Sequence, residues 1–431
     1  MISRAVVGFA FGAIACAAIA CAPPANAPIP PARKPALAIV DDDYARALAD
    51  ARAAHRPIVA VSGAAWCDPC REMRAVVLED PRLAAHARDF TWLSIDVERD
   101  ENAAFVARFA SEALPVVWVI DTATEDPAIA WRGSASVRMV EQLAQIGADA
   151  IRGRDPGGDP EAALWRGLRA DASGERDRAL AEYRLATDKG AGATRALAVT
   201  AAVALLSDRD RSACADLAAR EAPALPADLA APVVAAGIEC EARAPLVDLA
   251  RKLVSDSSAL AGDRSALWAR IVATDARDAV AADARAWLAF LDAESAKAPS
   301  SRARASLDGA RLAAHLALGE PDRAVAALAR TERDLPRDYA APAHLARAFA
   351  AAKRWDDALR AIDRALALAY GPHRVALLAR KVDVQVGGGD AHAALRTLEE
   401  ALTLARSLPL SGGYARLRAT LEIRRAEWRV R

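Results

Sequence analysis

Short apolar runs alternate with helical stretches between residues 41 and 151, and this alternation constrains the fold more than any other feature of the sequence. Ile58–Val61 is typical of a buried strand, and further strand patterns occupy 90–97, 116–121 and 129–132. Helical patterns occupy about 41–55, 71–88, 102–111 and 136–151. Strands that alternate with helices in this way predict an α/β unit, a mixed sheet with helices on both faces.

Cys67 and Cys70 lie where the first of these strands gives way to a helix. A side chain at a helix start lies beside free backbone N–H groups and the positive end of the helix dipole, and both stabilise a thiolate. We therefore expect Cys67 to be a nucleophile that attacks disulfides, and Cys70, one turn later, to close the intramolecular disulfide. Pro69 suits this first turn because its missing N–H costs nothing there. The pattern predicts a redox-active dithiol.

Other uses of a Cys-x-x-Cys pair lack their partner residues in this sequence. A structural zinc site needs two more ligands, and there is no second Cys-x-x-Cys and no nearby His pair. Haem attachment needs a His directly after the second Cys, where Arg71 stands. The six His residues show no metal-ligand spacing. We expect neither a metal nor a cofactor.

The segment Trp66-Cys67-Asp68-Pro69-Cys70 resembles the active site of the thioredoxin family. Pro115, which precedes a strand, matches the position where that family holds a cis-proline beside the dithiol, and Gly133 matches the glycine before its last helix. The segment 79–82 resembles the branch that includes the C-terminal domains of periplasmic thiol:disulfide interchange reductases. The resemblance covers 37–152. It implies a thioredoxin-like fold, active-site support from Trp66, Pro69 and Pro115, and client or electron-donor proteins with thiols or disulfides as partners.

Two positions depart from the family pattern. Many thioredoxins place a buried Asp six residues before the first Cys as a proton acceptor for the second, and Val61 stands there in this chain. Proton transfer at Cys70 would then need water or another group. Asp68 replaces the usual Gly, and its carboxylate should repel a Cys67 thiolate while Arg71 partly offsets it. These departures put fast general disulfide reduction in doubt.

The N-terminal residues have the pattern of a secretory signal, a positively charged start followed by an uncharged apolar run over 5–22. Ala18-Ile19-Ala20-Cys21 resembles a bacterial lipobox, which implies a signal peptide over 1–21 and lipidation of Cys21. The alternative is an uncleaved anchor, since 18 apolar residues could just span a bilayer. Residues 22–36 are rich in Pro and predict an extended linker. We expect export to the periplasm or cell envelope, with membrane contact through the N-terminus only.

Residues 153–160 are rich in Gly and Pro and predict a linker, and 161–431 contain only helical patterns. Similar helix junctions end at Ala324, Ala358 and Ala394, 34 and 36 residues apart, close to the tetratricopeptide period of 34. Residues 174–179 resemble a first copy. Helices that repeat in this way predict a solenoid with a concave face for protein partners. A helical spacer or a dimerisation surface is the alternative.

Cys214 and Cys240 lie 26 residues apart in this helical region, compatible with neighbouring helices. They form either a structural disulfide in an oxidising compartment or two buried free thiols. The 57 basic and 57 acidic residues cancel, which disfavours binding to nucleic acid because phosphate contact needs a net basic face.

The sequence therefore predicts an exported bacterial thiol–disulfide oxidoreductase that uses Cys67 and Cys70 and carries helical repeats for protein partners. The alternative, from a different functional class, is a cell-envelope adaptor whose thioredoxin-like domain has little redox turnover.

Overall fold

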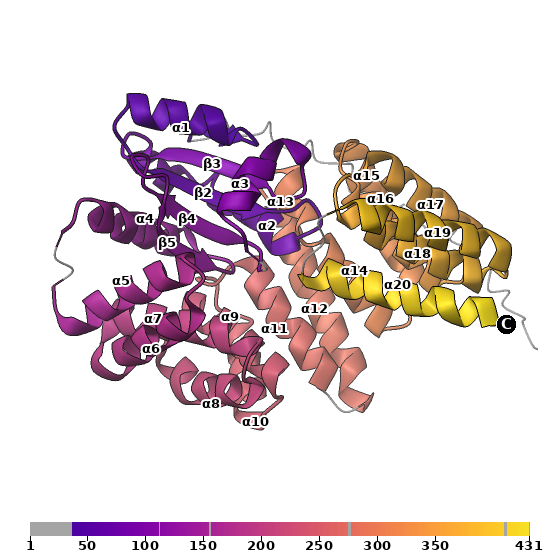
Figure 1. The fold of residues 1–431 in the computed structure, drawn as a ribbon. Helices are drawn as coiled ribbons and strands as arrows, with labels where there is room; N and C mark the ends of the chain where they lie inside the picture. The colour runs from indigo at the N-terminus through magenta and orange to yellow at the C-terminus, as the bar shows by residue number, and fades with distance from the viewer. Residues whose placement is uncertain (1–36, 112, 155–156, 275–276, 409–411, 431) are drawn as a thin grey trace, which may run out of the picture.

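The computed structural model describes residues 37–111, 113–154, 157–274, 277–408 and 412–430. A five-stranded sheet with its helices forms the N-terminal part, and a long all-helical region follows it and curves around one side of the sheet (Figure 1). Cys21, the expected signal peptide and the Pro-rich linker lie outside the described residues.

The sheet has the order β1-β3-β2-β4-β5. Its strands are β1 (Ile39–Asp41), β2 (Ile58–Gly63), β3 (Thr91–Asp96), β4 (Val116–Ile120) and β5 (Pro127–Arg132). β3 runs parallel to β1 and β2, whereas β4 is antiparallel to both β2 and β5. The predicted mixed sheet is confirmed, and its central strand β2 leads directly to the Cys-x-x-Cys segment.

Helices cover both faces of this sheet. Successive side chains of β2 point to opposite sides, and all of them are buried. Ile58 and Ala60 pack in a core beneath α1 (Tyr44–Ala53) and α3 (Ala103–Arg108). Val59 and Val61 face the other core, which includes residues of α4 (Val137–Ile151). The short helix α2 (Asp68–Glu72) lies on this second face.

Three details differ from the sequence prediction. The edge strand β1 was not expected, because three residues are too few to show a period-two pattern. The single helix expected over 71–88 is instead α2, a π-helical turn (Met73–Val77) and a 3₁₀ helix (Pro81–His86). Asp80 caps the last of these by accepting a hydrogen bond from the Arg82 backbone N–H, so the chain starts a new element at Pro81. The helix expected over 102–111 is shorter and spans only Ala103–Arg108.

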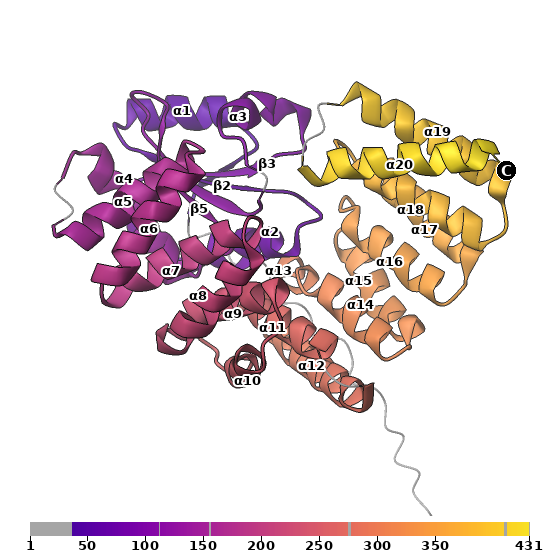
Figure 2. The same ribbon diagram turned by 60° about the horizontal axis from the view of Figure 1, so that its bottom comes forward.

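The all-helical region packs its successive helices against one another (Figures 1 and 2). Its α-helices are α5 (Asp159–Ala172), α6 (Arg176–Lys189), α7 (Gly192–Ser207), α8 (Arg211–Glu221), α9 (Ala227–Cys240), α10 (Ala244–Leu253), α11 (Ala261–Thr274), α12 (Arg277–Lys297), α13 (Ser301–Ala305), α14 (Asp308–Ala317), α15 (Val325–Asp334), α16 (Ala340–Ala351), α17 (Trp355–Leu368), α18 (His373–Gly387), α19 (Ala391–Ser407) and α20 (Gly412–Val430). We call the region from α5 to α20 the helical array.

The helix junctions singled out in the sequence each join two helices of the array. Residues 319–324 lie between α14 and α15, 353–358 connect α16 to α17, and 389–394 connect α18 to α19. In the middle junction and its helices, Leu345, Ala346, Ala358, Ile362 and Ala365 are all buried. Small side chains at these positions let the paired helices approach closely.

The array is packed against the sheet unit and shares its core. One hydrophobic cluster runs from the sheet face at Val59 and Val61 through α4 and onward to Ile271 in α11. At the junction, Arg132 of β5 forms an ion pair of 2.9 Å with the buried Asp171 of α5. Across the described ranges, no helix combines the length and the apolar composition needed to cross a bilayer.

Candidate functional site

Cys67 and Cys70 form a disulfide at the start of α2. Cys67 is the N-cap residue, and its Sγ accepts a hydrogen bond of 3.2 Å from the backbone N–H of Cys70. That N–H is one of the donors that the first helical turn cannot pair internally, so it is available to stabilise negative charge on the Cys67 sulfur. Pro69 stands in the same first turn, where a missing N–H removes no helical hydrogen bond.

β2, the strand before the dithiol, ends in Gly63, and a residue with a side chain at this position would collide with Cys70. A Cβ at Gly63 would lie 2.7 Å from the Cβ and 3.1 Å from the Sγ of Cys70. Ala64 and Leu114 complete the apolar contacts of the two cysteines. The peptide bond between Leu114 and Pro115 is cis, and Pro115 immediately precedes β4.

Both cysteines are nearly buried, with 5% of Cys67 and 6% of Cys70 exposed. Trp66, directly before them, is 37% exposed, and one face of its ring packs against the array. Its ring stacks on His373 of α18 with the ring centroids 5.4 Å apart, and its indole N–H donates to Glu98 at 2.7 Å. The array therefore covers part of the dithiol segment.

Glu98 is one of the residues through which the array contacts the region beside the dithiol. It is buried and also accepts hydrogen bonds from the hydroxyl of Tyr414 and the backbone N–H of His373. Burial raises the pKa of Glu98, and these hydrogen bonds act in the opposite direction. Sequence reasoning missed these residues because Glu98 and Tyr414 are 316 positions apart, and no local pattern connects them.

The helix that carries the dithiol is anchored in the array by two carboxylates one turn apart. Glu72 is buried and accepts hydrogen bonds of 3.0 and 3.1 Å from the Gly262 N–H at the start of α11. Asp68 lies against Gly309 at the start of α14. At both glycines an added Cβ would come within 2.3 Å of a carboxylate oxygen, so each carboxylate fits because a glycine faces it.

Burial shifts the protonation of both carboxylates. Desolvation raises the pKa of Asp68 to about 7, and the nearby Arg71 partly opposes the shift while Asp308 adds to it. Desolvation likewise raises the pKa of Glu72 to about 8, with a further increase from Asp263. The departure from the family pattern at Asp68 is therefore a titratable group beside Cys67 and in contact with the array.

Asp68 belongs to a wider polar cluster between α2 and the array. Arg71 forms an ion pair of 2.7 Å with Asp338 and lies 3.8 Å from Asp68. The half-buried His344 of α16 faces the same cluster, and desolvation lowers its pKa to about 3 with a further decrease from Arg71. Among the described residues, Asp68 Oδ1, Arg71 Nη1 and His344 Nδ1 are buried atoms without a hydrogen-bond partner.

Val61 occupies the position where the resemblance implies a proton acceptor, and it is buried. It lines a cavity of about 620 Å³ that also reaches Cys70.

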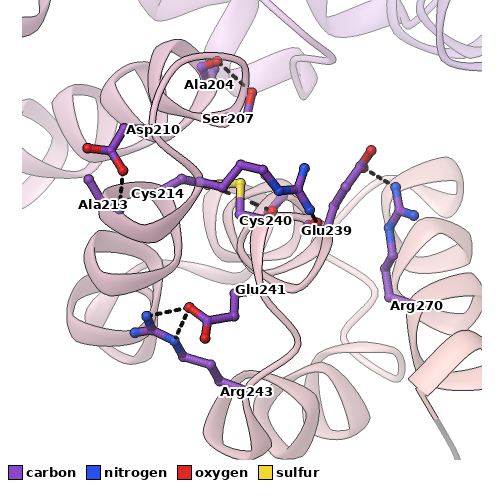
Figure 3. Close-up of a disulfide and its surroundings, with 12 residues drawn as sticks. Ala204, Ser207, Asp210, Ala213, Cys214, Glu239, Cys240, Glu241, Arg243 and Arg270 are labelled. Atoms are coloured by element: carbon purple, nitrogen blue, oxygen red, sulfur yellow. Dashed lines mark hydrogen bonds and ion pairs between the residues drawn. A yellow bond between two sulfur atoms is a disulfide. The ribbon is translucent and has the colours of Figure 1, made fainter.

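The second cysteine pair is also joined. Cys214 of α8 and Cys240 of α9 form a disulfide 26 residues apart, deep between helices of the array (Figure 3). Just after Cys240, Glu241 and Arg243 form an ion pair of 2.7 Å in the segment between α9 and α10 (Figure 3). Within the part of the chain that the structure describes, no cluster of three or more His, Cys, Asp or Glu side chains could hold a metal ion.

Residues 38–122 match a protein-family model described as Thioredoxin-like. The match begins before β1, ends after β4 and includes both cysteines of the dithiol. No curated protein matches the chain. The chain thus contains a thioredoxin-like domain with a Cys-x-x-Cys disulfide, followed by a long all-helical region.

Proposed function

We propose that this protein is an exported bacterial thiol–disulfide oxidoreductase that works through Cys67 and Cys70. The observation that carries the proposal is the Cys67–Cys70 disulfide at the start of α2, with a backbone N–H directed at the Cys67 sulfur. Stabilisation of the Cys67 thiolate increases the fraction of the reactive, ionised form and makes it a good leaving group.

The exchange follows from the positions of the two sulfurs. In the reduced protein the Cys67 thiolate attacks a client disulfide, forms a mixed disulfide and releases one client thiolate. Cys70 then loses its proton and attacks the Cys67 sulfur, which closes the intramolecular disulfide and releases the second client thiolate. Two electrons pass to the client. The same steps in reverse oxidise a client dithiol.

The array supplies the second part of the proposal. We assign its helices to tetratricopeptide-type repeats that bind protein partners, on the strength of the 34- and 36-residue junction spacing and the small buried side chains at Ala346 and Ala358. We also propose that the chain is lipidated at Cys21 and held at the cell envelope, on the strength of the N-terminal sequence pattern alone. Mass spectrometry of the mature N-terminus from a membrane fraction tests this assignment.

The second candidate function is an envelope adaptor with little turnover. Two observations favour it: the dithiol is 5–6% exposed, and Val61 replaces the proton acceptor. The full-length protein decides between the two in an insulin-reduction assay with dithiothreitol as the electron source. We expect a rate above the free-thiol background that Cys67→Ser abolishes, while the Cys214→Ser, Cys240→Ser double variant retains it. A rate that does not depend on Cys67 would favour the adaptor.

A further inference from the structure

Among the described residues, the helical array contributes to two large hydrophobic clusters, and the first is shared with the sheet. It joins the sheet to the array as far as Ile271 in α11. The second cluster runs from Leu312 in α14 to Leu421 in α20, and Ala65 is the one described residue of the thioredoxin-like domain that packs against it. Helices α15–α20, which we call the cover, form a stack of their own beside the dithiol helix α2 (Figures 1 and 2).

The cover contacts the region of the dithiol mainly through polar groups. The polar contacts join Arg71 to Asp338 at 2.7 Å, Asp96 to the hydroxyl of Tyr370, Glu98 to the hydroxyl of Tyr414 and the backbone N–H of His373, and the Arg99 guanidinium to the Tyr370 ring at 4.7 Å. Contacts of this polar kind are typical of transient interfaces between domains that move relative to one another. The cover and the domain are therefore joined much less firmly than the sheet and the first part of the array, which share a hydrophobic core.

The contact between the cover and the domain is also incompletely packed. Both sides border the cavity of about 620 Å³, with Ala64 and Cys70 on the domain side and Tyr339 and Tyr370 on the side of the cover. The Tyr339 hydroxyl is a buried atom without a hydrogen-bond partner in the described part of the chain. A buried polar atom without a partner disfavours the state that buries it, and water can bind it once the contact opens.

The cover lies over the approach to the dithiol. Trp66, which directly precedes Cys67, stacks on His373 of the cover with the two ring planes 11° apart. Cys67 itself is only 5% exposed. A client thiolate or disulfide has to reach the sulfur with which it exchanges, so the rate depends on access to that sulfur. In this arrangement Trp66 and the cover take up the space that a folded client protein would need at Cys67.

We propose that the cover is an autoinhibitory lid on the dithiol, closed in this arrangement and displaced by a client protein. The cover turns about α14, because Leu312 of α14 packs in the cluster of the cover while Ala314 packs in a small cluster with α12. The proposal rests on the proposed redox function and adds the control of access to Cys67. A client that binds the open arrangement better than the closed one shifts the equilibrium by that difference in affinity. The low exposure of the dithiol is then a property of the closed state and is compatible with turnover.

The test measures access to Cys67 in full-length, reduced Cys70→Ser protein. It uses two reagents with the same reactive group, N-ethylmaleimide and a poly(ethylene glycol) maleimide of several kilodaltons, and follows the loss of the unmodified Cys67 peptide by mass spectrometry. Tyr370→Phe with Tyr414→Phe removes two hydrogen bonds to carboxylates at the contact and keeps both rings. Carboxylates that lose donors in the closed state favour the open state, where water binds them. We therefore expect this variant to raise the rate of the large reagent, relative to that of the small one, about tenfold.

A second variant and a matched control separate opening of the cover from a general loosening of the fold. His373→Ala removes the ring that stacks on Trp66, and it should raise the same ratio of rates. Tyr183→Phe removes a buried tyrosine hydroxyl in α6, within the cluster that the array shares with the sheet, and should leave the ratio unchanged. Far-UV circular dichroism and urea midpoints identify a variant that does not fold, and His373→Ala carries the test if the tyrosine double variant is one of them.

A ratio that neither variant changes would overturn the lid. Equal acceleration with both reagents would also overturn it, because the substitutions would then act on the reactivity of the thiol and not on access to it. With Cys70 restored, the tyrosine double variant should reduce insulin several-fold faster than the wild-type protein. The labelling needs no turnover, so a protein that labels as expected but does not reduce insulin loses the proposed function and keeps the lid. A protein that reduces insulin and labels alike with and without the substitutions keeps the function and loses the lid.

Discussion

The described part of the chain contains two disulfides whose surroundings differ. Cys67 and Cys70 are three residues apart at a helix start, with a backbone N–H on one sulfur and a cavity beside the other. Cys214 and Cys240 are 26 residues apart and join two packed helices, and Cys214 is completely buried. The same covalent bond can thus serve exchange in one region and hold helices together in the other.

The difference follows from what each bond constrains. A bond across two intervening residues removes little freedom from the unfolded chain, so breaking it costs little stability. A bond across 26 residues removes much more. The short pair can therefore open and close during exchange without loosening the fold, whereas the long pair contributes to the stability of the array around it.

Removal of each disulfide in turn tests this comparison most directly. In the chain-entropy model, Cys214→Ser with Cys240→Ser should lower the free energy of unfolding by about 3.5 kcal/mol, and Cys67→Ser with Cys70→Ser by only about 1.6 kcal/mol. Urea unfolding of the full-length variants, followed by far-UV circular dichroism, measures both. Equal losses, or a larger loss for the Cys67–Cys70 variant, would contradict the division of roles.

The sequence predicted the thioredoxin-like domain better than it predicted the contacts of the helical array with that domain. The alternating pattern and the Trp66–Cys70 segment were enough for a mixed sheet with a Cys-x-x-Cys pair at a helix start, because strand periodicity and a helix start are both local features. Three-residue β1 and the π-helical turn after α2 carry no comparable local pattern.

The contacts of the array with the dithiol could not be predicted in this way. Glu72 and Gly262 are 190 positions apart, and Arg71 and Asp338 are 267 apart. Each residue alone is typical of an exposed helix surface, since a charge on a helix usually faces solvent. Only the packing of the array on α2 brings them together, so the sequence pointed to a separate partner-binding unit where the structure has a shared core.

The anchoring of α2 gives a second prediction, which concerns pH. Burial raises the pKa of Glu72 to about 8, so between its unfolded value near 4.5 and pH 8 the folded protein binds a proton that the unfolded chain does not. Glu72 therefore makes the free energy of unfolding fall as the pH rises from about 5 to 9, by an amount on the order of a few kcal/mol at most.

Glu72→Gln should remove this part of the pH dependence, because the amide can still accept the Gly262 hydrogen bond and has no charge to desolvate. Urea midpoints at pH 5.5 and 9 measure the effect. The matched control is Glu422→Gln on the exposed face of α20, which should retain the wild-type slope. A Glu72→Gln protein with the wild-type slope would show that this carboxylate does not titrate across the interface.

The smallest expected effect concerns Asp68, which belongs to the dithiol segment and also contacts the array. Its pKa is raised to about 7, mainly by burial, so it is largely protonated at pH 5.5 and ionised at pH 8.5. An ionised carboxylate beside Cys67 disfavours the thiolate, and the neutral acid does not. Asp68→Asn in a reduced Cys70→Ser background should therefore speed alkylation of Cys67 by iodoacetamide about two- to fivefold at pH 8.5 and leave it nearly unchanged at pH 5.5. Asp50→Asn, on the exposed surface of α1, should change neither rate. The same acceleration at both pH values would mean that the substitution acts by loosening the contact with Gly309, and the electrostatic role of Asp68 would be wrong.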